Sequence, residues 1–223
     1  MGQDTVTTKE ALLEAAGELF AEAGLEGVSI RAIAEKCKVN IAAVNYHFGS
    51  KENLYLEVVR HVMTKTQCRL ADAFLTRKEA WCGQPQRCAE MVYRLVEERI
   101  NQFFPGNHPR WYGRMFMRVL LSPTPALWKL VEEIVMPDFE SLQEVLRCCK
   151  PGMTVPESEL WTDSLIGLLS HYVFSEQFIE YIPERCSYNA EFKAQVLRHV
   201  SRMLIKGLDL PLPEVLQEGG THA

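Results

Sequence analysis

The sequence lacks the features that mark several large classes of protein. Lys and Arg number 24 against 29 Asp and Glu, so the net charge of −5 excludes a uniformly basic nucleic-acid coat. No apolar run approaches the roughly 18 residues that cross a membrane, and the N-terminus has no charged segment leading into an apolar one. The 13 Gly and 11 Pro are too few for a disordered or collagen-like chain. We therefore expect a folded cytoplasmic protein that does not associate with membranes.

Cysteine pairs of the C-x-x-C type are also absent, although the chain has seven cysteines. Without such pairs we expect neither structural zinc nor thioredoxin-like redox chemistry, and we predict reduced thiols, no metal and no cofactor. Cys148 and Cys149 are adjacent and leave two interpretations open. They are either a thiol sensor or small residues that end a helix, because adjacent cysteines rarely form a relaxed disulfide.

The motifs of common enzyme classes are missing as well. The chain has no G-x-S-x-G elbow, no phosphate-binding loop, no H-E-x-x-H sequence and no Gly-rich turn after a strand. The neighbouring residues His47 and Ser50, and likewise Ser170 and His171, have no arrangement that singles out a nucleophile. We predict that the protein is not an enzyme.

Helical patterns cover most of the sequence, whereas strand signals are nearly absent, so the predicted fold class is all-α. Thr7 and Glu10 fit a capping box that begins a first helix, and Gly24 closes it. Short second and third helices follow Ser29 and Asn40, which are both good N-caps. Further helices are predicted from 51 to about 76 and near 85–104, 109–121, 124–136, 137–149, 157–181 and 189–208, with a frayed tail from Leu210 onward.

Two short helices separated by about four residues have the geometry of a helix-turn-helix, in which one helix steadies the other in the major groove. This unit coincides with a basic segment. Residues 28–70 carry a net charge of +4, whereas residues 1–27 carry −5 and the remainder −4. A basic island in an acidic chain favours local binding to a phosphate backbone.

The third predicted helix has the side chains that a recognition helix needs. Ala42 and Ala43 are small enough to let a helix sit deep in a groove, and the Asn45 amide suits adenine. Tyr46 and His47 can both bond phosphate. The alternative for these polar residues is structural: Tyr46 packs at the edge of the head, His47 caps the helix and Asn45 only faces water.

Lys51 begins the fourth predicted helix, where its charge and the free amides of a helix N-terminus both attract a phosphate. Val44 and Phe48 have the spacing of core residues on the third helix.

The segments Gly27–Ala34 and Tyr46–Leu54 closely resemble the DNA-binding domain of the TetR family of bacterial transcriptional regulators, and the resemblance covers about residues 8–60. It implies a homodimer with two DNA-binding heads, an all-helical C-terminal domain that dimerises and holds a ligand pocket, and release of DNA when the ligand binds. It also implies a role in DNA binding for Ser29, Arg31, Asn40, Ala42, Ala43, Asn45, Tyr46, His47 and Lys51. Of these, Ser29 and Arg31 are expected on the DNA backbone, Ala42, Ala43, Asn45 and Tyr46 toward bases, and His47 and Lys51 on phosphate.

One step departs from the family pattern. Where many relatives have Gly-Val-Ser before the recognition helix, this chain has Lys38, Val39 and Asn40. Asn still caps and turns well, so the motif is preserved, but the operator sequence is not predicted.

The expected domain division follows from these patterns. Residues 1–53 form the helix-turn-helix domain, 54–76 a connecting helix, 77–209 the helical ligand-binding and dimerisation domain, and 210–223 the tail. By analogy with the family, the helices near 157–181 and 189–208 form the dimer surface.

Aromatic and Met side chains of the C-terminal part could line an apolar pocket or simply form its core. The wider set also includes Tyr112, Met117, Met136 and Phe178. The predicted ligand-binding residues are Trp111, Met115, Phe116, Trp128, Trp161, His171 and Tyr172. His171 lies among apolar residues and is expected to be half-buried, which makes it the best single candidate for a ligand contact.

We thus predict a ligand-responsive, sequence-specific transcriptional regulator. In the principal hypothesis it is a dimeric repressor that a small apolar or aromatic molecule releases from a near-palindromic double-stranded DNA operator. The alternative is a DNA-binding regulator controlled by thiol oxidation or by a protein partner.

Overall fold

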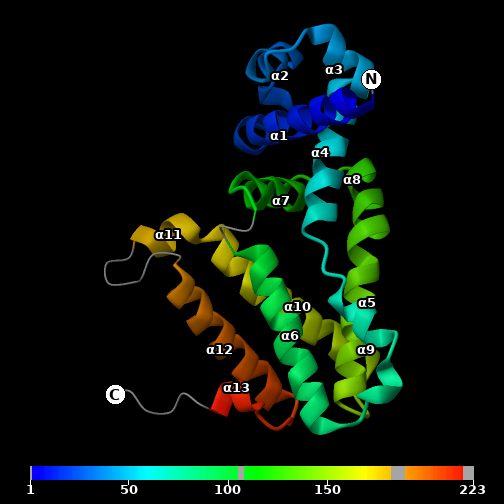
Figure 1. The fold of residues 1–223 in the computed structure, drawn as a ribbon, viewed down its shortest axis with the longest axis vertical. Helices are drawn as coiled ribbons and strands as arrows, with labels where there is room; N and C mark the ends of the chain where they lie inside the picture. The colour runs from blue at the N-terminus through cyan, green and yellow to red at the C-terminus, as the bar shows by residue number, and fades with distance from the viewer. Residues whose placement is uncertain (1, 105–107, 182–188, 218–223) are drawn as a thin grey trace. The chain divides into compact units, whose positions relative to one another are not determined.

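The structure is a computed structural model that describes residues 2–104, 108–181 and 189–217 (Figure 1). All regular structure within these ranges is helical, which confirms the predicted all-α class. Cys186 and the predicted breaks at Pro105 and Pro183 lie outside the described residues. The chain divides into two compact units, which are described separately: unit 1 is Met1–Thr66 with His108–Val135, and unit 2 is Gln67–Asn107 with Met136–Ala223.

Unit 1 contains the predicted DNA-binding head and three further helical segments. Its elements are α1 (Gly2–Gly27), α2 (Ile30–Cys37), α3 (Ile41–Phe48), α4 (Lys51–Lys65), α7 (Trp111–Leu121), α8 (Pro125–Leu130) and the π-helix η2 (Val131–Val135). Helix α1 packs against α4, α7 and α2. Fully buried side chains from these helices, among them Leu12, Phe20, Leu54 and Met115, form one continuous core.

Helix α1 differs from its prediction at one end and agrees at the other. It begins at Gly2, so Thr7 lies inside the helix and is not its N-cap. The prediction was wrong because the residues between Gly2 and Thr7 include no helix breaker. At the other end, Gly24 interrupts the helix with a φ of 74° and a ψ of 177°, a conformation that glycine adopts without strain.

Helix α4 ends earlier than the sequence pattern suggests. The pattern predicted one helix from 51 to about 76, but α4 stops at Lys65 and a new helix begins only at Leu70. The Thr66 hydroxyl donates to the Val62 carbonyl at 2.9 Å, alongside the Thr66 backbone N–H. A side chain that bonds the backbone locally weakens continuation of a helix, and this explains the stop.

Helix α7 belongs to unit 1 because its first residue packs into a gap on α1. The gap is at Gly17: a Cβ atom there would lie 2.2–2.6 Å from three ring atoms of Trp111. Further along α7, the Arg118 guanidinium donates to the backbone carbonyls of Ala21 and Glu22, which are near the end of α1. Residues 108–135 therefore fold with the head, whereas the expected division placed them in the domain 77–209.

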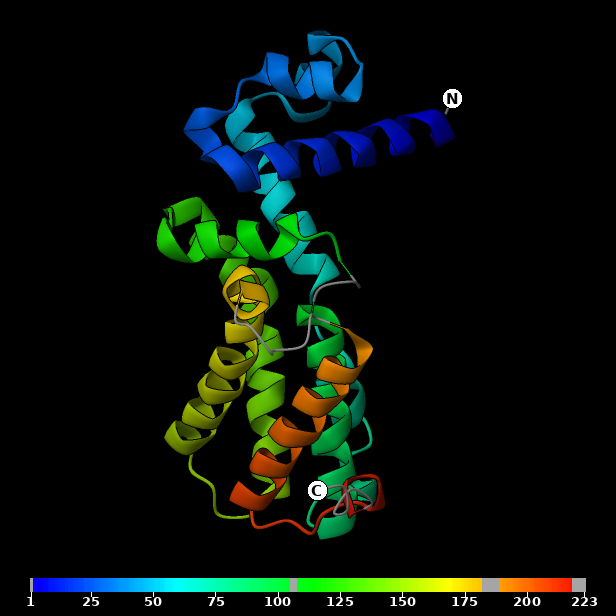
Figure 2. The same ribbon diagram turned by 90° about the vertical axis from the view of Figure 1, so that its left-hand side faces the viewer.

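Unit 2 is a bundle built mainly from α6, α9, α10 and α12. Its elements are α5 (Leu70–Leu75), the 3-10 turn η1 (Lys78–Ala80), α6 (Pro85–Phe103), α9 (Met136–Cys149), α10 (Val155–Phe174), α11 (Glu176–Tyr181), α12 (Ala190–Gly207) and α13 (Glu214–Gln217). Helices α6 and α12 lie side by side, as Figure 2 shows, and α10 packs on both α9 and α6. The stretch predicted as one helix over 157–181 is two, because the backbone turns at Ser175.

The core of unit 2 contains a buried ion pair between α6 and α9. The Arg99 Nη2 atom lies 2.7 Å from Asp138 Oδ1, and both side chains are almost completely buried. Burial raises the pKa of Asp138, and the neighbouring guanidinium opposes that shift. Breaking such a pair would leave an isolated charge in the core, so it fixes how α6 and α9 meet.

The residues after Leu210 are partly ordered rather than frayed. Leu216 of α13 is buried, and its carbonyl accepts a hydrogen bond from the Arg202 guanidinium of α12. The predicted tail was wrong for residues 210–217 because Leu216 covers apolar surface of unit 2 that would otherwise face water. Across the described ranges, each helix is too short or too polar to cross a bilayer.

The contact between Gly17 and Trp111 gives a direct test of this fold. Ala normally stabilises a helix interior relative to Gly by about 1 kcal/mol. At position 17 we expect Gly17→Ala to destabilise the protein instead, by about 1–3 kcal/mol, because the methyl group overlaps the indole ring. Thermal or urea unfolding of the full chain measures the change.

The matched control is the same substitution in a Trp111→Leu background, in which the overlapping ring atoms are gone. There the cost of Gly17→Ala should largely disappear. A stabilising Gly17→Ala in the otherwise unchanged protein would contradict the packing of α7 on α1.

Candidate nucleic-acid interface

Helices α2 and α3 form a helix-turn-helix whose turn is closed by the backbone. The Ser29 hydroxyl accepts a hydrogen bond from Ala32 N at 3.1 Å and caps α2. At the other end of α2, Lys38 adopts a left-handed conformation with a φ of 54°. The Val39 backbone N–H then donates to the Ala34 carbonyl at 3.0 Å, which turns the chain toward α3.

The cap of α3 is the residue that the sequence indicated. The Asn40 Oδ1 atom accepts a hydrogen bond from Ala42 N at 2.9 Å. Val44 and Phe48 are buried in the core of unit 1, as expected, and they fix the rotation of α3. Gly49 ends the helix, and its backbone N–H donates to the Asn45 carbonyl.

The opposite face of α3 is open to solvent. Ala42, Asn45 and Tyr46 are exposed, and Ala43 and His47 are half-buried. Tyr46 is 83% exposed, so it does not pack at the edge of the head. Its ring stands edge-on to that of His47, with centroids 5.4 Å apart. An exposed aromatic hydroxyl with no structural task is a feature of a binding face.

Lys51 lies at the first position of α4, directly after the cap of that helix. The Ser50 hydroxyl accepts from Asn53 N at 3.1 Å and caps α4. Hydrogen bonds from its own backbone N–H and from Ser50 lower the pKa of Glu52. Lys51 and the α4 N-terminus together make a place where a phosphate is favoured.

Arg31 lies in the first turn of α2 and pairs with Glu35 in the free protein. Its Nε atom lies 2.9 Å from Glu35 Oε1, and both side chains are well exposed. The pKa of Arg31 is raised by this neighbour. A surface pair of this kind is weak, so a DNA phosphate can replace Glu35.

The predicted ligand-binding residues divide between the two units. Trp111 and Met115 are buried in the core of unit 1, Phe116 is half-buried there, and Trp128 is 53% exposed. These four residues therefore belong to a different unit from the other three. Their apolar character indicated burial correctly for Trp111 and Met115 but not which unit would bury them.

In unit 2, Trp161 and Tyr172 are half-buried and His171 is exposed. The expectation of a half-buried His171 was wrong: it lies on the outward side of α10, where its Nδ1 atom is 3.2 Å from Ser175 Oγ. Trp161 instead fills the space over Gly207 of α12. Tyr172 packs against the rings of Phe104 and Phe192, with centroids 5.5 and 6.0 Å away.

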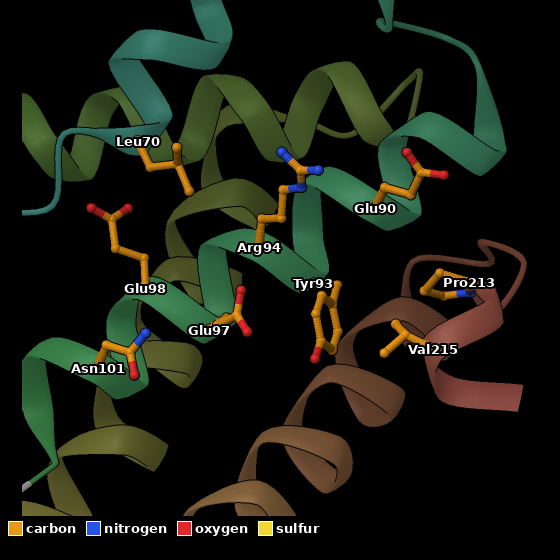
Figure 3. Close-up of a pocket in the computed structure, with 9 residues that line it drawn as sticks. All are labelled: Leu70, Glu90, Tyr93, Arg94, Glu97, Glu98, Asn101, Pro213 and Val215. Atoms are coloured by element: carbon orange, nitrogen blue, oxygen red, sulfur yellow. The ribbon is translucent and has the colours of Figure 1, made fainter. Parts of the chain in front are cut away.

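A surface hollow of about 560 Å³ lies beside α6, at a place that the sequence analysis did not indicate (Figure 3). It is lined by Leu70, Glu90, Tyr93, Arg94, Glu97, Glu98, Asn101, Pro213 and Val215. Five of these residues are polar or charged side chains along α6. This pattern is typical of a helix face in contact with water.

Two parts of the chain match known families. Residues 12–58 match the bacterial regulatory proteins of the tetR family. Residues 88–208, more than half of the chain, match the C-terminal domain of the HTH-type transcriptional dual regulator CecR. The helix-turn-helix and these matches define the class of helix-turn-helix transcriptional regulators. Within that class, the chain belongs to the TetR family of bacterial regulators.

Individual relatives are similar over part of their length. The HTH-type transcriptional repressor Rv3405c of Mycobacterium tuberculosis is 49% identical over 55 residues, which are 25% of this chain and 29% of that relative. The dual regulator CecR of Shigella flexneri is 28% identical over 146 residues, or 62% of each chain. The chain thus covers less than two thirds of the length of these relatives.

Solved structures share the fold over most of the chain. PfmR from Thermus thermophilus has a TM-score of 0.60 at 20% identity, and the match covers 87% of this chain and 94% of PfmR. FadR from Bacillus subtilis, solved with stearoyl-CoA, has a TM-score of 0.60 at 16% identity, and the match covers 89% of this chain and 98% of FadR.

The Asn40 cap gives a direct test of the structural role of Asn40. We expect Asn40→Ala to destabilise the protein by about 1 kcal/mol, because Ala42 N loses its partner. Asn40→Ser keeps a capping oxygen and should cost only a few tenths of a kcal/mol. Urea unfolding measures both variants, and equal losses in the two would show that the cap is not what Asn40 contributes.

Proposed function

We propose that this protein is a sequence-specific DNA-binding transcriptional regulator, and specifically a dimeric repressor that a small apolar or aromatic molecule releases from its operator. The observation that carries the DNA-binding part is the free outer face of α3. That face combines small residues, an amide and an exposed Tyr46 in a helix whose other side is fixed in the core. The protein acts in the cytoplasm as a binding protein rather than an enzyme.

Each residue of the interface has a separate task in this proposal. Asn45 reads a base edge in the major groove, and Ala42 and Ala43 let the α3 backbone approach the bases. Tyr46 lies next to them and reaches either a base or the sugar-phosphate backbone.

The remaining contacts position the head on the duplex. His47 and Lys51 bind phosphate at the C-terminal side of the motif. Ser29 and Arg31 do so at the start of α2, where Arg31 exchanges Glu35 for a phosphate. Asn40 acts through the cap of α3, and residues 28–70 supply a local net charge of +4 in a chain of net charge −5.

The dimer is proposed to form through α10 and α12. Along α10, Leu160, Gly167 and His171 share one exposed face at helical spacing, and Leu160 is 66% exposed. No atom lies within 4 Å of the Cβ position of Gly167, so a second helix can approach closely there. Met203 adds an exposed apolar side chain on α12. The exposure of His171 fits this face better than it fits a pocket.

The effector is proposed to bind within unit 2, against the rings of Phe104, Tyr172 and Phe192. These rings come from the ends of α6, α10 and α12, so a ligand there would touch three helices. Five and two residues before Phe104 in the sequence, the Arg99 Nε and Gln102 Oε1 atoms are buried without a hydrogen-bond partner. Buried polar atoms of this kind are stabilised when a ligand or water pairs with them. A ligand in one solved relative, stearoyl-CoA in FadR, supports a ligand-binding role without identifying the ligand here.

The fluorescent aromatic probe 8-anilinonaphthalene-1-sulfonate tests the effector site. We expect Tyr172→Ala to weaken probe binding by about 2- to 10-fold, because one aromatic contact is lost. Trp128→Ala, which removes an exposed tryptophan of unit 1, is the control and should have no effect. Equal losses of probe binding in the two variants would contradict the proposed effector site. In a separate measurement, DNA release that depends only on oxidant and on Cys148 or Cys149 would favour control by thiol oxidation instead.

Lys51 provides the test of DNA contact. We expect Lys51→Ala to weaken binding to a mixed-sequence duplex and to reduce the slope of log K against log salt by about one phosphate. Fluorescence anisotropy over a range of salt concentrations gives the slope. The matched control is Lys65→Ala, which removes the same charge from the other end of α4. An unchanged slope in Lys51→Ala would exclude the proposed phosphate site.

A further inference from the structure

Four cysteines from two distant parts of the chain come together in unit 2. Cys82 lies in the turn before α6 and Cys88 in the first turn of that helix, whereas Cys148 and Cys149 end α9 (Figure 1). The Gly83 backbone N–H donates to the Cys148 carbonyl at 3.3 Å. This hydrogen bond holds the turn that carries Cys82 against the end of α9.

The four thiols form two pairs across this contact. The Cys82 thiol donates to the Cys148 carbonyl oxygen, and the Cys149 thiol donates to the Cys88 carbonyl oxygen at 3.9 Å. The Cys82 and Cys88 sulfurs also lie 3.7 and 3.9 Å from the same carbonyl oxygen, that of Cys148. Among the described residues, no group of three or more His, Cys, Asp or Glu side chains is placed to hold a metal ion. The arrangement is therefore that of dithiol pairs.

The two pairs differ in their access to solvent. Cys82 is exposed and Cys148 is half-buried, whereas Cys88 and Cys149 are buried. A small oxidant in water thus reaches the first pair and not the second. Burial and the contact with Cys82 raise the pKa of Cys148 to about 12, so its thiol is protonated at neutral pH and reacts slowly.

We propose that Cys82 and Cys148 are an oxidation site at which hydrogen peroxide forms a surface disulfide. The Cys82 sulfur attacks peroxide and breaks the O–O bond, which yields a sulfenic acid and one water. The Cys148 sulfur then attacks the Cys82 sulfur, the S–S bond forms, the S–O bond breaks and a second water leaves. The two thiols together lose two electrons and two protons, and one peroxide is reduced to two waters.

The proposed pair Cys82–Cys148 differs from the adjacent pair Cys148–Cys149 that stands out in the sequence. Cys148 and Cys149 are consecutive residues of α9, where adjacent cysteines rarely form a relaxed disulfide. The Cys82–Cys148 bridge instead links residues 66 positions apart and ties the start of α6 to the end of α9. A cross-link over so long a segment restricts the unfolded chain and stabilises the folded unit.

The experiment is oxidation of the full chain with excess hydrogen peroxide, followed by thiol counting after denaturation. We expect the number of free thiols to fall from seven to five. Trypsin cuts after Arg87 and so places Cys82 and Cys88 in different peptides, which lets mass spectrometry under non-reducing conditions show which of the two is linked to the peptide that contains Cys148 and Cys149. The oxidised protein should also melt about 5 °C higher, and a reductant should reverse the shift.

The variants decide between pairings. Cys82→Ser has an exposed position and should fold normally, and its six thiols should all persist after peroxide. Cys148→Ser should behave in the same way, whereas the control Cys37→Ser should lose two thiols like the unchanged protein. A titre that stays at seven in the unchanged protein, or a linked peptide that contains Cys88 in place of Cys82, would overturn the proposal.

Discussion

The packing of Trp111 on Gly17 is the contact on which the form of the DNA-binding unit depends. It allows α7 to lie directly on α1, and Arg118 then holds the end of α1 through two backbone carbonyls. The Tyr112 hydroxyl adds a third link, because it lies 3.2 Å from Glu14 of α1 and 3.0 Å from His61 of α4. As a result, the helices that carry the DNA-binding face share one core with residues from the middle of the chain.

The boundaries of the two structural units differ from those of the family matches. The match to the CecR C-terminal domain covers residues 88–208, yet residues 108–135 within it fold into unit 1. The region that matches the CecR C-terminal domain therefore contributes α7 and α8 to unit 1. Helix α7 contacts α1 and α4 through hydrogen bonds of 2.8–3.2 Å.

The sequence predicted the local features of the head well and the long-range ones poorly. Ser29, Asn40 and Ser50 all cap the helices they were expected to cap, because a capping hydrogen bond involves residues only two or three positions apart. The burial of Trp111 also followed from its apolar character, but its partner Gly17 did not, since periodicity does not say which helices meet. The predicted half-burial of His171 was wrong for a related reason, because residues that are neighbours in the sequence face different sides of a helix. The pairing of Cys82 with Cys148 likewise depends on the meeting of α6 and α9, and no local signal marks it.

The central claim, sequence-specific binding by a dimer through α3, is tested most directly by selecting bound sequences from a random duplex pool at about 150 mM salt, where nonspecific attraction is largely screened. We predict a near-palindromic motif with half-site centres about 34 Å apart or a multiple of that distance, because two heads related by a twofold axis meet successive major grooves. Failure of the folded protein to enrich any motif, or enrichment of a single site without inverted symmetry, would contradict it.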